Sequence, residues 1–139
     1  MFLKLNIERP KKEEILKEVT GDSFNIFERL KNKIFGSARY DIISVEPDIF
    51  KQRPSERICA NLEIRKKGLA IYFRFNHDEY ALVTNFHQLT IMKDENLIIQ
   101  MNTHRITLKI NNTNDHIAFV RNLLKKKAEV YESSTILTK

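Results

Sequence analysis

Apolar and polar residues alternate through most of the chain between residues 58 and 110, and short polar turns divide this region into six runs. Alternation with a period of two indicates strands that bury one face. The six predicted strands therefore span residues 58–65, 69–76, 80–86, 87–93, 97–101 and 104–110. Because consecutive runs are joined by short turns, the pattern predicts antiparallel pairing. At the first of these turns, Gly68 is expected to supply the positive φ of a tight reversal.

Three further elements flank this region. Residues 40–45 are rich in β-branched side chains and predict one more strand, and residues 1–7 predict a short edge strand. Residues 115–131 have the three- and four-residue spacing of an amphipathic helix. Its apolar side, expected to close the sheet, is formed by Ile117, Val120, Leu124 and Tyr131, and is broadened by Phe119 and Leu123.

After this short edge strand, the segment up to residue 37 has helical rather than strand periodicity. Pro10 suits a first helical position, and Gly21 suits the residue that ends a short helix. A second helix is predicted between Asp22 and Gly36. Its apolar stripe is expected either to join the core or to face a partner chain, and consists of Phe24, Phe27, Leu30 and Ile34.

Counted from residue 40, seven strands followed by one helix resemble the pleckstrin-homology-like (PH-like) superfold, as found in small bacterial proteins. The resemblance rests on topology and covers about residues 40–131. It implies an α+β fold, in which two near-orthogonal antiparallel sheets form a seven-stranded barrel or sandwich capped by the C-terminal helix. We therefore expect an N-terminal helical extension packed on the main domain (1–37), a PH-like domain (38–131) and a frayed tail (132–139).

The positive charge is spread evenly along the sequence. The formal net charge is +6, and residues 1–37, 38–112 and 113–139 each contribute +2. A basic rim that binds anions is one hypothesis, and a solvated turn or helix face is the alternative. The candidate anion-binding residues are Lys51, Arg53, Arg57, Arg65, Lys66 and Lys67. The lipid-binding pattern of eukaryotic PH domains is not reproduced, and the chain has no tryptophan.

Motifs of known chemistry are missing from the sequence. The four histidines lack metal-ligand spacing, and no phosphate-binding glycine loop or nucleophile motif occurs. We therefore expect no catalytic residue, metal or cofactor, and no enzymatic activity. The single cysteine, Cys59, cannot form an internal disulfide. Together with a first segment unlike a signal peptide, this favours the cytoplasm, and no apolar run predicts a membrane span.

Three functional classes follow from these observations. The first is a non-enzymatic interaction or scaffold module that binds a protein or peptide, or a second copy of the chain as a homodimer, through a sheet edge or groove. The second is binding of anionic lipid or nucleic acid through the basic rim or the last helix. The third is a small-molecule binder or enzyme, which requires a lined cavity.

Overall fold

A computed structural model describes residues 2–4, 9–22, 39–47, 57–75, 78–93, 95–111 and 113–137. Its strands form one antiparallel sheet in the order β1-β5-β4-β3-β2-β8-β7-β6. The helical elements are α1 (Arg9–Thr20), the 3-10 helix η1 (Phe86–Gln88) and α3 (Thr113–Leu137). The strands are β1 (Phe2–Lys4), β2 (Tyr40–Glu46), β3 (Cys59–Ile64), β4 (Gly68–Phe75), β5 (Asp78–Asn85), β6 (Thr90–Lys93), β7 (Leu97–Gln100) and β8 (Arg105–Lys109).

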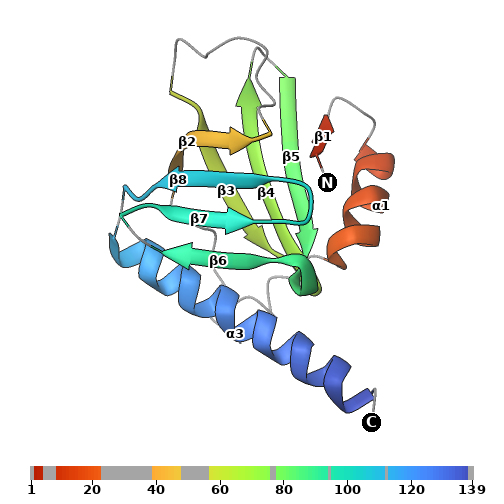
Figure 1. Cartoon of the computed structure of the whole chain (residues 1–139). Coiled ribbons are helices and arrows are strands. Elements are labelled where there is room, and N and C mark those ends of the chain that lie inside the picture. Colours follow the sequence, from red (N-terminus) through yellow and green to blue (C-terminus); the bar gives the residue numbers. More distant parts are fainter. Residues whose placement is uncertain are drawn as a thin grey trace.

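The sheet consists of two meanders, β2–β5 and β6–β8, which are joined where β2 pairs with β8. Figure 1 shows β3, β4 and β5 running across the direction of β6, β7 and β8. Strand β2 pairs with β3 only through Tyr40 and Asp41, but with β8 as far as Glu46, and its register shifts between Ile42 and Ser44. Such a bulge bends a strand, which lets β2 take part in both halves of the sheet.

The predicted α+β class, with an antiparallel sheet followed by a C-terminal helix, is confirmed. All seven predicted strands between residues 40 and 110 are present. The strand predicted over residues 87–93 is shorter than expected and begins at Thr90, because Phe86–Gln88 form the 3-10 helix η1. The sheet is open rather than a closed barrel. In the described part of the chain its two end strands, β1 and β6, each pair with one neighbour, β5 and β7 respectively.

The main hydrophobic core lies between the two halves of the sheet. It is built from the inward-facing alternate residues of both meanders, such as Leu62 of β3, Ile71 of β4 and Ile106 of β8, all nearly inaccessible to solvent. Phe119 and Leu123 of α3 belong to the same cluster. Burying this much apolar surface provides most of the favourable free energy of folding.

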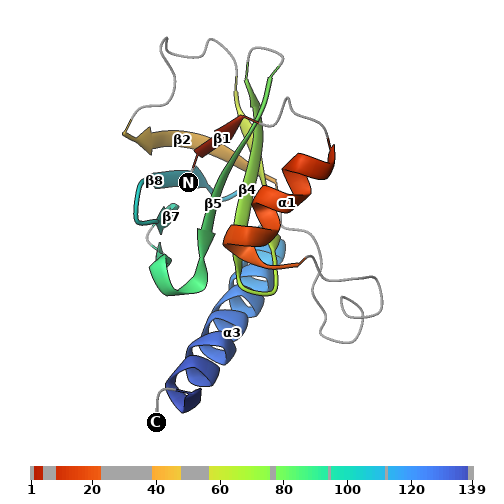
Figure 2. The same cartoon turned by 90° about the vertical axis from the view of Figure 1, so that its right-hand side faces the viewer.

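A second, smaller core lies on the outer face of β4 and β5, where α1 packs (Figure 2). Leu16 of α1 contacts the small side chains Ala70, Ala81 and Val83. The carboxyl end of α1 is also fixed to the β3–β4 turn, because the amides of Lys66 and Lys67 donate to the carbonyls of Asp22 and Thr20. Helix α1 therefore covers one part of this face and leaves the rest accessible.

Two glycines serve different purposes. Gly21 ends α1 with a φ of 75°, a left-handed conformation that glycine adopts without strain. Gly68 was expected to have a positive φ, but Gly21 is the described glycine that has one. At Gly68 glycine is needed because β4 and β5 approach each other closely. A Cβ atom at this position would lie 2.2 Å from the carbonyl oxygen of Thr84 in β5.

Helix α3 buries part of the side that the sequence predicts, since Phe119 and Leu123 are buried and Val120 packs against the main core. Its buried residues are His116, Phe119 and Leu123, whereas Ile117 and Leu124 are 41% and 49% exposed. The predicted contact of Ile117 and Leu124 with the sheet is therefore wrong. The helix is also longer than expected and continues to Leu137, through most of the segment 132–139 expected to be frayed. No helix in the described ranges is both long and apolar enough to cross a bilayer.

Candidate functional site

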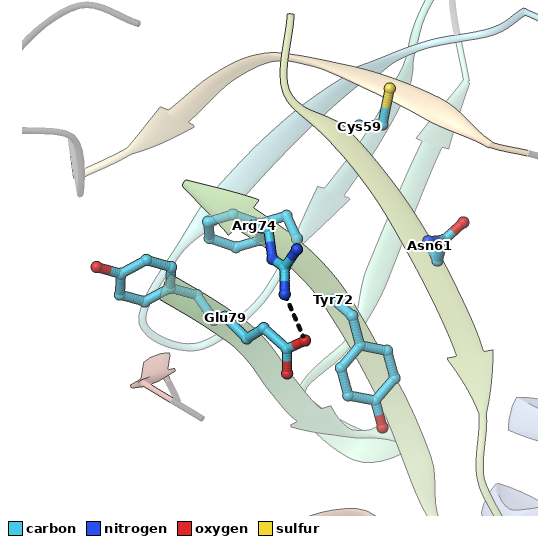
Figure 3. Close-up of a pocket in the computed structure, with 7 residues that line it drawn as sticks. Cys59, Asn61, Tyr72, Arg74 and Glu79 are labelled. Atoms are coloured by element: carbon cyan, nitrogen blue, oxygen red, sulfur yellow. Dashed lines mark hydrogen bonds and ion pairs between the residues drawn. The ribbon is translucent and has the colours of Figure 1, made fainter. Parts of the chain in front are cut away.

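An open pocket of about 400 Å³ lies on the outer face of β3, β4 and β5 (Figure 3). It occupies the part of this face beside the smaller core that α1 covers. The residues that line it belong to three neighbouring strands, β3, β4 and β5. The lining residues are Cys59, Asn61, Tyr72, Phe73, Arg74, Glu79 and Tyr80.

Strand alternation explains why polar groups gather here. Ala60 and Phe73 face the core, so Asn61, Tyr72 and Arg74 beside them face outward. Pairing of β4 with β5 places Arg74 opposite Glu79, and their side chains form an exposed ion pair of 3.4 Å. Asn61 is likewise opposite Tyr72. The pocket thus combines charged, amide and aromatic groups on a rigid sheet.

A buried polar network holds Tyr72 in place. Its hydroxyl donates to Glu63 Oε1 at 2.7 Å, and the same oxygen accepts from Arg65 Nη1 at 3.2 Å. Arg65 is 1% exposed, and its Nε also donates to the carbonyl of Gly21 at the end of α1. Burial, followed by the hydrogen bond to Glu63 and its charge, raises the pKa of Tyr72 and so favours the protonated phenol that donates to Glu63.

A second polar group adjoins the pocket at the start of β3. The Arg57 guanidinium donates to Asp41 Oδ2, and the Cys59 thiol lies 3.4 Å from Asp41 Oδ1. Burial opposes ionisation of Asp41, but hydrogen bonds from Arg57, Cys59 and Asn111 outweigh it and lower the pKa of the carboxyl group. Burial, and then the nearby Asp41 carboxylate, raises the pKa of the Cys59 thiol.

These environments limit the chemistry of the pocket. A protonated thiol is a weak nucleophile, and the acidic groups near it are paired with cations. Within the described ranges, no three His, Cys, Asp or Glu side chains are placed to hold a metal ion. An open site lined by Tyr and Arg resembles protein interfaces, in which these residue types supply much of the binding energy.

The predicted basic rim is divided by β3. Arg57 precedes this strand and Arg65 follows it. Because β3 has six residues in extended conformation, its two ends lie about 20 Å apart. Arg57 is paired with Asp41, and Arg65 is buried. Lys66 and Lys67 are exposed at the turn beside Arg65. Two further predicted members, Lys51 and Arg53, lie outside the described residues.

The predicted partner-facing stripe, Phe24, Phe27, Leu30 and Ile34, also lies outside the described residues. Conversely, sequence reasoning did not single out Asn61, Tyr72, Arg74 or Glu79 as site residues. The available signal was their position on the polar side of three consecutive strands. That signal becomes a site only through the strand register and the position of α1, which leaves their shared face accessible.

Comparison of the chain with protein-family models, with curated proteins and with solved structures yields no match.

Proposed function

We propose that this chain is a non-enzymatic interaction module with a PH-like fold, and that it binds a protein or peptide partner. The observation that supports this proposal most directly is the open pocket on the outer face of β3–β5, where Tyr72, Arg74 and Glu79 present aromatic and charged groups. The PH-like class is supported by the two crossing meanders and by the helix that follows them. Phe119 and Leu123 of that helix pack between the two halves of the sheet.

The nature of the pocket favours a polypeptide over a small molecule or a substrate. Small-molecule sites are mostly concave and apolar, and they enclose most of the ligand. Here Arg74 and Glu79 have 70% and 50% of their side-chain surface exposed, so both are available to a partner that approaches from solvent. Their opposite charges match a polar protein surface better than a polyanion. The raised pKa of the Cys59 thiol disfavours its use as a nucleophile.

Site-directed photo-crosslinking in the native host tests this proposal. A benzophenone amino acid replaces Asn61, which is exposed in the pocket, and in a matched control it replaces Thr90, which is exposed on β6 at the other end of the sheet. We expect a discrete protein adduct from position 61 and not from position 90. Adding Arg74→Ala and Glu79→Ala should remove the adduct at little cost in stability, because exposed ion pairs contribute about 0–1 kcal/mol.

The proposal is rejected if positions 61 and 90 give the same adducts, or if the adduct survives loss of both Arg74 and Glu79. The exposed described cations of the predicted rim are Arg57, which is paired with Asp41, and Lys66 and Lys67. The alternative of anionic lipid or nucleic-acid binding is tested on the two lysines. Such binding weakens steeply with salt. It is tested by co-sedimentation with phosphatidylserine vesicles and by a DNA shift assay at low salt. The double variant Lys66→Glu, Lys67→Glu is the control.

A further inference from the structure

A row of polar side chains crosses the outer face of the sheet at the level of the pocket. Lys109 of β8 is opposite Asp41 of β2, which is in turn opposite Cys59 of β3. The register of β3 with β4 places Cys59 beside Arg74, and Arg74 is opposite Glu79 of β5 (Figure 3). Residues directly opposite each other share one face of a sheet, with their Cβ atoms about 5 Å apart. The row therefore continues the pocket across β2 to β8.

Two arginines lie beside this row. Arg57 precedes β3 and donates to Asp41, with 74% of its side chain exposed. Arg39 directly precedes β2, and the register of β2 with β3 places it beside Asn61 of the pocket. Burial and the Asp41 carboxylate raise the pKa of Cys59, and the two guanidinium groups oppose this rise, so both lie near the thiol. Arginine side chains therefore border the pocket at its β2 end.

The charges of this surface do not balance. Its two carboxylates, on β2 and β5, are each paired with one arginine. Two further cations, Arg39 and Lys109, are exposed to solvent. Among the described residues of the row and its border, positive side chains thus outnumber negative ones, and the surplus lies at β2 and β8. Exposed cations in excess attract the carboxylates of a partner.

The order of the charges selects among anionic partners. The carboxylate of Asp41 lies within the row, and Glu79 ends the row at β5. A uniformly negative surface, such as a membrane or a nucleic acid, would place negative charge against both carboxylates. A polypeptide can instead place carboxylates over β2 and β8 and other side chains over β5. The row crosses five neighbouring strands and spans about 19 Å, which about six extended residues cover.

We infer that the partner segment bound by this face is acidic where it crosses β2 and β8, and that its carboxylates pair with Arg39 and Lys109. The segment lies across the strands, and its other end occupies the pocket beside Arg74 and Glu79. This inference rests on the proposed function, because it names the chemistry of the partner that the pocket binds. The charges also orient the segment, since its acidic end is attracted to β8 and repelled by Glu79.

A defined acidic probe tests the two cations. Fluorescently labelled octaglutamate is titrated at low salt into the full-length wild type and the double variant Arg39→Gln, Lys109→Gln, with anisotropy as the readout. Both side chains are exposed, so the variant should remain folded. We expect it to bind octaglutamate about tenfold more weakly than the wild type, because two exposed ion pairs are lost.

The matched control is Lys66→Gln, Lys67→Gln, which removes the same net charge at the far end of β3. This control should bind octaglutamate like the wild type. An equal loss of affinity in the two double variants overturns the inference, because net charge alone would then explain binding. The inference is also overturned if the wild type does not bind octaglutamate, or if Arg39→Gln, Lys109→Gln binds it unchanged.

Phosphatidylserine vesicles and a DNA duplex are titrated into the same three proteins. We expect Arg39→Gln, Lys109→Gln to change the affinity for either by less than about twofold, because Asp41 and Glu79 disfavour a uniformly negative surface. A loss as large as that for octaglutamate would assign the two cations to polyanions in general and overturn the inference.

The cross-link from position 61 separates this inference from the proposed function. Its adduct should weaken in Arg39→Gln, Lys109→Gln, and the partner segment that carries the cross-link, identified by mass spectrometry, should have a net negative charge. A segment without net negative charge overturns the inference and leaves the proposed function standing. Absence of any adduct rejects the proposed function by itself, whatever the affinity for octaglutamate.

Discussion

The phenol oxygen of Tyr40, the first residue of β2, lies 2.7 Å from Nδ1 of His116 in α3. Both side chains are buried, and their rings meet edge to face with centroids 5.7 Å apart. Seventy-six positions along the chain separate them. This hydrogen bond ties the C-terminal helix to the strand that joins the two meanders.

Removing this hydrogen bond should destabilise the protein without creating a large cavity. We expect Tyr40→Phe to lower the free energy of unfolding by about 1–2 kcal/mol, because the buried imidazole nitrogen loses its phenol partner. Urea denaturation followed by circular dichroism measures the change. Tyr80→Phe is the matched control, since its hydroxyl has no hydrogen bond among the described residues, and it should cost less than about 0.5 kcal/mol. Equal losses of stability in Tyr40→Phe and Tyr80→Phe would contradict a stabilising hydrogen bond between Tyr40 and His116.

The pKa of Tyr40 also leads us to predict that the protein loses stability in alkali. Burial, with a smaller contribution from Asp115, raises the pKa of Tyr40 from 10.0 to about 12. Because the folded-state pKa is the higher one, this stability is fully present below pH 10 and is lost as the pH rises to about 12. The rise corresponds to about 3 kcal/mol.

The measurement is the free energy of unfolding between pH 9 and pH 12, for wild type and Tyr40→Phe. We expect a shallower decline in the variant, because it has one fewer tyrosine that must remain un-ionised in the folded state. Tyr72, whose pKa is also raised, should preserve part of the slope. Tyr40→Phe combined with Tyr72→Phe should flatten it further, and parallel curves for all three proteins would contradict the prediction.

The two described glycines should respond differently to substitution. In Gly68→Ala the new methyl group meets backbone atoms of Thr84 that cannot move aside, so we expect a loss of about 3 kcal/mol. In Gly21→Ala the main cost is the left-handed backbone, about 1–2 kcal/mol. Thermal and urea denaturation of the two variants give the comparison. A smaller loss for Gly68→Ala than for Gly21→Ala would show that β4 and β5 are not so close there.

Arg65 should stabilise the attachment of α1. Arg65→Met keeps the apolar stem but leaves Glu63 without this cation and the Gly21 carbonyl without this donor. Loss of one partner of a buried pair costs about 3–5 kcal/mol, and the partial exposure of Glu63 places the expected loss at the lower end. In the same Arg65→Met variant, the amides of α1 should exchange hydrogen faster than in the wild type. Adding Glu63→Gln should recover part of the loss, whereas strictly additive losses would argue against the pair.

The strands could be predicted because their signal is local. In β3 and β8 the polar and apolar positions predict the observed burial almost residue by residue, because each side chain's face follows from backbone geometry. Arg65 shows where this stops. Its place beside a turn suggests a solvated cation, yet the end of α1, 44 residues away in sequence, covers it. No local pattern contains that contact.

The sequence by itself determined where the strands and the C-terminal helix lie, since periodicity and turn residues depend on neighbours along the chain. Tertiary structure alone decided that His116 of α3 is buried, where Tyr40 gives it a hydrogen-bond partner, and that Ile117 and Leu124 stay exposed. It likewise decided that Tyr72, Arg74 and Glu79 share one pocket, through strand register and the position of α1. The physical reason is that side chains are buried against, and hydrogen-bonded to, residues far away in sequence. The alternation of inward and outward side chains, in contrast, is set within each strand.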